Sequence, residues 1–232
     1  MQIAILAPAP NSPAFEIAAT IQRVGMEPLD FSWGAPVETL NKADAYVLLS
    51  DSPADWSASN TEALSPLLQI QNRRGKPILG LGYGSATLLA DQGFIPGLFK
   101  NMSGLSLVKG ESASTEAWIR LSPDYQYNAF TQVFPSQLLL PVSLTTPARF
   151  VIPPGLLAEI EAQGLNVFQY CSPEGQLLRD IAALSNKAGT VMALLPYPVK
   201  NPAGDLLFLS LRTHLETGYL ESVEPMYYWP RK

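Results

Sequence analysis

The first half of the chain alternates between continuous apolar runs and segments whose apolar residues recur every three or four positions. Continuous apolar runs are typical of buried parallel strands, and we predict such strands at 2–7, 28–31, 45–49 and 78–81. Helical spacing separates these runs, and it predicts helices at 12–21, where Ser12-Pro13 provides a cap and first turn, and at 61–71. This alternation predicts an α/β fold with a parallel sheet and right-handed crossovers.

From about residue 100 to 175 the pattern changes to short β-like pieces. We predict strands there at 117–121, 137–142 and 166–170, a helix at 156–163 and a further strand at 190–195. The chain shows no internal repeat and no low-complexity tract, so we expect a single domain spanning residues 1–232. The aromatic tail at 226–230 is expected to pack on the body of the protein or on a partner.

Composition narrows the functional classes. The chain has 232 residues and a net charge of −5, and its only basic cluster is Arg73-Arg74 with Lys76, so nucleic acid is not an expected partner. No run approaches the ~20 apolar residues of a membrane helix and no secretory leader is present, which predicts a cytoplasmic location away from the membrane. The single cysteine, Cys171, and the single histidine, His214, exclude an internal disulfide and are too few for a usual zinc site. We therefore expect no metal and no cofactor.

The most informative stretch is 75–89, where a buried strand leads through Gly80-Leu81-Gly82-Tyr83-Gly84 directly into a helix. Such a strand–turn–helix elbow presents one side chain at the C-terminal edge of the strand, beside the free N–H groups of the helix start. In hydrolases and amidotransferases that side chain is Ser or Cys, and the N–H groups stabilise an oxyanion.

Two blocks of the chain resemble the glutaminase subunit of phosphoribosylformylglycinamidine synthase, a class I glutamine amidotransferase of purine biosynthesis. The first block is the elbow with Gly93-Phe94-Ile95-Pro96-Gly97 and Lys100-Asn101, similar to the family's Gly-Ile-Cys-Asn-Gly elbow, its Leu-Pro-Gly turn and its Arg-Asn pair. The second block is Val167-Phe168-Gln169-Tyr170 with residues 189–198, similar to the strands that lead to the family's Met-Pro-His-Pro-Glu. The resemblance covers most of the chain and implies a flavodoxin-like, class I glutamine amidotransferase-type domain with a mainly parallel central sheet.

The departures from the family pattern fall on the catalytic residues. The family's nucleophilic cysteine aligns with Gly82, its histidine base with Tyr197 and its glutamate orienter with Val199. These three groups work as one unit, and the loss of any of them costs orders of magnitude in rate. The family's glycine-rich oxyanion loop aligns with Leu49-Ser50-Asp51-Ser52-Pro53, which contains no glycine. The resemblance therefore implies a vestigial pocket with no catalytic residue and no glutamine hydrolysis.

Other side chains could supply catalytic groups, but structural roles are more natural for them. Ser85 could be a substitute nucleophile, but its place in the first turn of the helix favours a capping role. Cys171 with His214 could form a dyad, but a buried structural thiol is the commoner fate of a lone cysteine. His214-Leu215-Glu216 repeats the His-X-Glu spacing of the family, although we expect a surface pair on the C-terminal helix.

The elbow glycines could instead cradle a phosphate, but their spacing does not match dinucleotide-binding folds, and no suitable acidic residue follows. A small anion at the helix start remains an alternative, with Tyr83, Gly84 and Ser85 as candidate pocket lining. The two tyrosines Tyr83 and Tyr197 are expected near the mouth of the pocket, where filling the vacated space is the simpler role.

Three functions are compatible with these observations. The first is a non-catalytic structural or regulatory subunit that binds a large synthetase subunit. The second is a stand-alone module that binds a small metabolite in the vestigial pocket. The third is an active amidotransferase that uses residues other than those of the family.

Overall fold

The computed structural model describes residues 1–8, 12–32, 40–56, 58–95, 106–109, 116–146, 148–198 and 202–218. Val199, the Lys100-Asn101 pair and the aromatic tail at 226–230 lie outside the described residues. The predictions made for these positions therefore stay predictions.

Five parallel strands form one half of a ten-stranded sheet, in the order β2-β1-β3-β4-β11. Their bounds are Gln2–Ala7 (β1), Glu27–Ser32 (β2), Ala45–Leu49 (β3), Ile78–Leu81 (β4) and Val191–Leu194 (β11). β3, β4 and β11 are buried at every position, as expected for parallel strands covered on both faces. All five strands were predicted from the apolar runs, and the structure confirms them.

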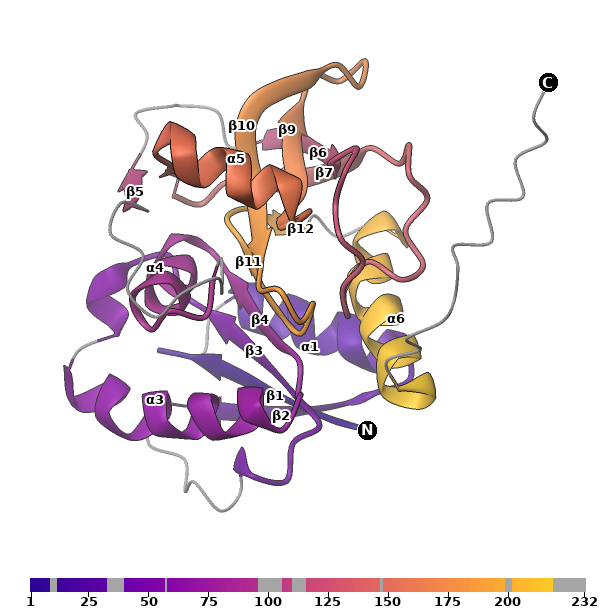
Figure 1. Ribbon diagram of the computed structural model, residues 1–232. Coiled ribbons are helices and arrows are strands. Elements are labelled where there is room, and N and C mark those ends of the chain that lie inside the picture. Colours follow the sequence, from indigo (N-terminus) through magenta and orange to yellow (C-terminus); the bar gives the residue numbers. More distant parts are fainter. Residues whose placement is uncertain are drawn as a thin grey trace.

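Helices cover both faces of this parallel half (Figure 1). α1 (Ser12–Arg23) and α6 (Pro202–Thr217) share a core with Ile3 and Ile5 of β1. α3 (Ala58–Arg73) and α4 (Tyr83–Asp91) share a second core with Ala4 and Leu6 of the same strand. Because alternate residues of a strand point to opposite faces, the two cores lie on opposite sides of the sheet.

The other half of the sheet is antiparallel and continues in the order β10-β9-β6-β7-β12. Its strands span Leu177–Ser185 (β10), Asn166–Cys171 (β9), Glu116–Leu121 (β6), Leu140–Ser143 (β7) and Tyr197–Pro198 (β12). The sheet as a whole is therefore mixed, with the parallel arrangement confined to five strands. The physical reason is that tight turns join β9 to β10 and β10 to β11, and such turns can connect only antiparallel neighbours.

Four further elements complete the described part of the chain, one of which is the short 3-10 helix η1 (Pro53–Asp55). β5 (Ser106–Lys109) and β8 (Ala148–Val151) pair in a separate two-stranded ribbon. The predicted helix at 156–163 appears as α5 (Pro154–Ala162), which packs against the core shared by α3 and α4. None of the helices in the described segments has the length and apolarity needed to span a bilayer.

Candidate functional site at the β4–α4 elbow

The elbow forms where the sequence predicts it. β4 ends at Leu81, α4 begins at Tyr83, and Gly82 between them has φ +87° and ψ 166°. This combination falls in a region of backbone space that is essentially restricted to glycine. The N–H of Gly82 donates to the carbonyl of Leu194 at 3.0 Å, which fixes the elbow to the neighbouring strand β11.

The space above Gly82 is filled by other parts of the chain. A Cβ atom on Gly82 would lie 2.5 Å from the carbonyl oxygen of Ser50, 2.6 Å from the hydroxyl of Tyr197 and 2.8 Å from Oδ1 of Asp51. All three distances are shorter than any normal contact of a Cβ atom. A side chain at position 82 would therefore have to displace the Ser50–Ser52 loop that follows β3.

The same loop takes up the N–H groups at the start of α4. The Ser50 carbonyl accepts hydrogen bonds from the backbone N–H of Gly84 at 2.9 Å and of Ser85 at 3.2 Å. A Cβ atom on Gly84 would lie 2.5 Å from the carbonyl oxygen of Ser52, so glycine at this position permits the close packing. Helix-start N–H groups of this kind bind anions in many folds, but these two already have a backbone acceptor.

Tyr197 and Asp51 form a hydrogen-bonded pair above the elbow. Burial raises the pKa of the Asp51 carboxyl, while hydrogen bonds from Tyr197 and Thr145 act in the opposite direction. The pKa of Tyr197 is raised, first by burial and then by the charge of Asp51. The phenol therefore stays protonated and donates a hydrogen bond to the Asp51 carboxylate. This hydrogen bond connects β12 to the loop after β3.

The side chain of Ser50 also stabilises the loop after β3. Its Oγ donates to Oδ2 of Asp55 at 2.6 Å, across the loop that carries the short 3-10 helix η1 (Pro53–Asp55). Sequence reasoning missed the roles of Ser50, Asp51 and Asp55. The signal was present in the Ser-Asp-Ser-Pro sequence at 50–53, because Ser and Asp side chains stabilise tight turns by hydrogen bonding to nearby backbone groups.

Ser85 does not cap the helix, so that prediction is wrong. The N-cap position is Gly82, without any side-chain hydrogen bond to the helix, and Ser85 lies three residues further along. The Ser85 side chain is 0% exposed, and its Oγ has no hydrogen-bond partner. Its Cβ faces Gly80 of β4, because the third residue of α4 points toward the sheet.

The two tyrosines do not fill one common space. Tyr197 belongs to the core shared by α1 and α6, whereas Tyr83 packs against the core on the face of α3 and α4. Gly84 and Ser85 are buried under the Ser50–Ser52 loop, so a ligand would reach them only if the loop moved. A cavity of about 430 Å³ adjoins Tyr197 instead, between α1, α6 and the end of β7.

Cys171 is buried at the end of β9, in the antiparallel half, as the structural reading predicted. The expected surface pair of His214 with Glu216 is wrong in part. His214 is only 7% exposed, and its Nδ1 lies 3.2 Å from Nε2 of Gln132, whereas Glu216 is exposed and pairs with Arg212. The reason is that residues two apart on a helix face different directions.

No cluster of three or more His, Cys, Asp or Glu side chains suited to a metal occurs in the described parts of the chain. The N–H groups of Gly84 and Ser85 are not free to bind a phosphate in this arrangement, because both donate to the Ser50 carbonyl.

This topology defines a domain of the class I glutamine amidotransferase type, with a central mixed sheet. A chain of the PurLQS structure of Thermotoga maritima superposes with a TM-score of 0.63 and 18% identity, and the match covers 92% of this chain and 98% of that one. The glutaminase domain of Trypanosoma brucei CTPS, solved with bound acivicin, superposes with a TM-score of 0.60 and 8% identity over 93% of this chain and 94% of that one.

Among proteins with similar sequences, the chain matches PurQ subunits of phosphoribosylformylglycinamidine synthase. PurQ of Mycolicibacterium paratuberculosis, a phosphoribosylformylglycinamidine synthase subunit, is 29% identical over 195 residues, which cover 79% of this chain and 80% of that protein. PurQ of Methanothrix thermoacetophila is 21% identical over 85% of this chain and 86% of its own. PurQ of Mycobacterium tuberculosis is 32% identical over 54% of this chain, a match that covers 53% of that protein. No family model matches the chain. The chain is therefore similar in sequence to PurQ subunits, at 29% identity over 79% of its length, and it shares the fold of class I glutamine amidotransferase domains.

Proposed function

We propose that this protein is a non-catalytic relative of the PurQ glutaminase subunit that acts through protein contacts. It does not hydrolyse glutamine, because Gly82 replaces the nucleophile, Tyr197 replaces the base and Val199 replaces the group that orients the base. A Cys–His–Glu arrangement of this kind acts as a unit, and each member is needed.

The observation that carries this proposal is the crowding above Gly82. Three atoms lie within 2.8 Å of the position that a Cβ atom would occupy, from Ser50, Asp51 and Tyr197. The substitutions therefore come with a repacked loop, in which Tyr197 and Asp51 take the space of the missing side chains. If the catalytic residues alone had changed and the pocket were still open, these three atoms would not lie so close to Gly82.

The proposed partner is a large synthetase subunit. The support comes from the relatives, since the matched sequences are subunits of phosphoribosylformylglycinamidine synthase and the matched chain from Thermotoga maritima was solved as part of PurLQS. The test is affinity purification of the tagged full chain from its own source. We expect a large synthetase chain to co-purify in a fixed ratio, and a preparation that brings down no such chain would contradict the assignment.

A second candidate is a stand-alone module that binds a small metabolite beside the vestigial pocket. The cavity of about 430 Å³ next to Tyr197 favours it, with polar groups from Thr20, Thr145 and Asp205. A ligand that binds only the folded state raises its melting temperature. A thermal-shift screen with amino acids and nucleotides therefore tests this candidate, and substituting Thr20 by Val should abolish any shift that arises in this cavity.

The third function, an active amidotransferase with other residues, has a direct test. Its sequence candidates for a nucleophile, Ser85 and Cys171, are both buried. A glutaminase assay of the pure protein decides between this function and the first.

A further inference from the structure

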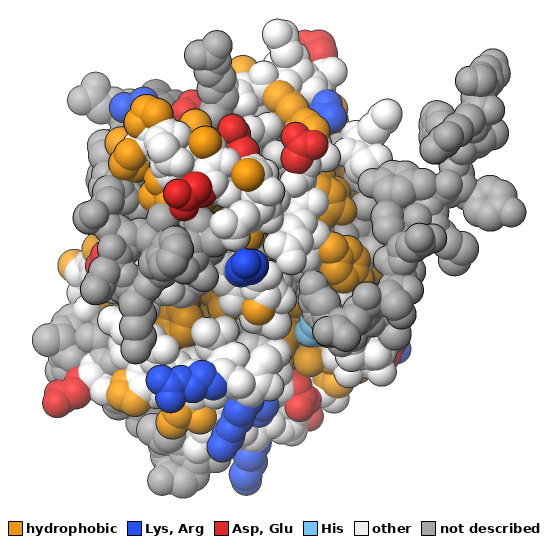
Figure 2. All heavy atoms as spheres, in the orientation of Figure 1, with side chains coloured by type: hydrophobic (Ala, Val, Ile, Leu, Met, Phe, Trp, Pro, Cys, Tyr) orange, Lys and Arg blue, Asp and Glu red, His pale blue; other side chains and the backbone are white. Residues whose placement is uncertain are grey.

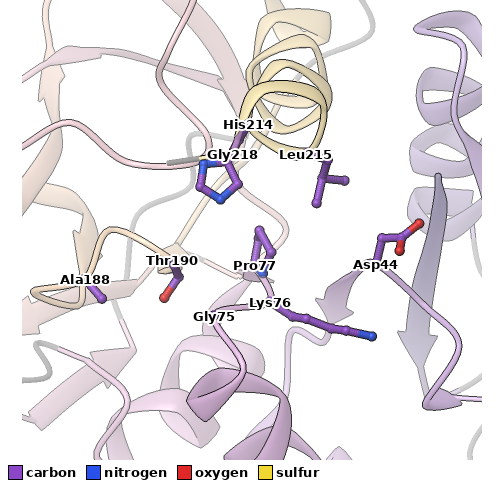
Figure 3. A pocket seen from close by; sticks show the side chains of 9 residues that line it. All are labelled: Asp44, Gly75, Lys76, Pro77, Ala188, Thr190, His214, Leu215 and Gly218. Carbon is purple, nitrogen blue, oxygen red and sulfur yellow. The ribbon is translucent and has the colours of Figure 1, made fainter. Parts of the chain in front are cut away.

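A second cavity, of about 630 Å³, lies at the N-terminal ends of the parallel strands, whereas Gly82 lies at their C-terminal ends. Its walls come from residues that precede three parallel strands, namely Asp44 before β3, Pro77 before β4 and Thr190 before β11. The last turn of α6 covers it from above, with His214 and Leu215 (Figure 3). Ligands of open α/β sheets usually bind at the other edge, at the carboxyl ends of the strands, so this cavity is separate from the elbow.

Lys76 places a positive charge at this cavity in a fixed position. Its Nζ donates to the carbonyl of Ala43 at 2.5 Å and to the carbonyl of Asn41 at 3.2 Å. An ammonium group has three donors, so one remains for a ligand. Lys76 forms no ion pair with any residue in the described ranges.

Two further cations are next in sequence to residues that line the cavity. Arg74 precedes the lining residue Gly75 and Lys187 precedes the lining residue Ala188, and both cations are exposed. Figure 2 shows Lys and Arg side chains gathered at the end of α3. Cations at a helix C-terminus stabilise the helix, and this accounts for Arg73 and Arg74 at the end of α3. It does not account for Lys187, which lies in the turn between β10 and β11.

The remaining walls offer apolar surface and further polar groups. Pro77 and Leu215 are apolar, and both line the cavity (Figure 3). The Thr190 hydroxyl accepts from Nδ2 of Asn186 at 3.2 Å, which leaves its own proton to donate. Oδ2 of Asp44 accepts the N–H of Gln2 at 2.8 Å, and its second oxygen can accept from a ligand.

We propose that this cavity binds a small organic phosphate that carries hydroxyl or amino donors, of about the size of a nucleoside monophosphate. Lys76 would hold the phosphate, with Lys187 and Arg74 adding to the local potential. A phosphate dianion matches several cations better than a carboxylate does. Asp44 accepts from the donors of the ligand, and the apolar walls cover its body. The volume falls within the range of about 300–1,000 Å³ that is typical of small-molecule sites.

The test is titration calorimetry on the full chain with adenosine monophosphate, adenosine, inorganic phosphate and glutamate. We expect saturable binding of adenosine monophosphate, and binding at least about tenfold weaker for adenosine and for phosphate alone, a difference of about 1.4 kcal/mol. Absence of saturable binding would overturn the proposal. Glutamate binding as tight as that of the monophosphate would overturn the choice of a phosphate.

Charge variants locate the site. Lys76→Gln and Lys187→Glu should each weaken the binding of adenosine monophosphate by about tenfold or more. Lys187 is exposed, so its variant keeps the measurement decisive even if Lys76→Gln does not fold. The matched control is Arg149→Glu, an exposed charge reversal on β8, away from the cavity, which should retain the affinity. Equal weakening by the control, or no weakening by Lys187→Glu, would show that binding occurs elsewhere.

Discussion

At the scale of the residue, the proposed absence of glutamine hydrolysis centres on Gly82. Glycine here permits the backbone angles of the elbow and leaves the space that Ser50, Asp51 and Tyr197 occupy. In an active elbow the nucleophile holds a strained conformation at a cost of about 1–3 kcal/mol. Glycine avoids that cost, and the Ser50 carbonyl, Asp51 and Tyr197 fill the space above it. Position 82 is therefore adapted to carry no side chain.

Substitution of Gly82 by Ala should be strongly destabilising. We expect a loss of at least about 1–3 kcal/mol in the free energy of unfolding, because alanine cannot easily adopt this conformation and its Cβ meets three atoms. Urea unfolding measures the effect. Gly155→Ala is the matched control, since nothing lies within 4 Å of the Cβ it would add, and it should be neutral or slightly stabilising. Equal stabilities of the two variants would contradict the packing described for the elbow.

Asp51→Asn should make the protein more stable than the wild type at about pH 7. Burial raises the pKa of Asp51 in the folded state, so ionisation opposes folding. The stability contributed by the protonated form is present at low pH and is lost as the pH rises from the unfolded value of 3.8 through the folded pKa. The advantage of Asp51→Asn should therefore be larger at about pH 7 than at about pH 4. An advantage that does not change with pH would contradict the assignment.

At the scale of the element, the loop after β3 is held against α4 and β12 by a few polar groups. The Ser50 carbonyl accepts hydrogen bonds from the first N–H groups of α4, and the Asp51 carboxyl accepts one from the hydroxyl of Tyr197. The elements themselves could be predicted from apolar periodicity, which gave the parallel strands and α1. The closed loop could not, because it depends on contacts between residues about 150 positions apart in the chain.

Tyr197→Phe tests how much the hydrogen bond between Tyr197 and Asp51 contributes to the stability of the folded protein. Removal of the hydroxyl leaves a buried carboxylate with one partner fewer, and this should cost about 1–3 kcal/mol in the free energy of unfolding. Tyr170→Phe is the matched control, because the buried hydroxyl of Tyr170 has no hydrogen-bond partner. Its removal should cost nothing. The account is contradicted if the two variants lose the same stability.

The docking of α6 adds a pH dependence that belongs to one residue. Burial lowers the pKa of His214, so the unfolded chain binds a proton more readily than the folded one. The free energy of unfolding therefore falls as the pH drops below the unfolded pKa of 6.5. Since His214 is the only histidine, His214→Gln should reduce this loss between about pH 7.5 and 5.5 in urea unfolding. A loss unchanged by the substitution would place its origin elsewhere.

At the scale of the whole molecule, the class of fold was predictable and the sheet was predictable only in part. The parallel half follows from continuous apolar runs joined by helices. The antiparallel half carries weaker patterns: the strand expected at 137–142 begins only at Leu140, and the buried place of His214 could not be read from its helix alone. Burial of a single polar side chain depends on what packs over it, and local periodicity does not contain that information.

The most direct test of the central claim is a glutaminase assay of the purified chain, alone and with a co-purified synthetase subunit. We predict no ammonia release from glutamine above the buffer rate at any protein concentration. Ammonia release that rises in proportion to the protein, and that Ser85→Ala or Cys171→Ala abolishes, would contradict the claim that this amidotransferase fold has lost its chemistry.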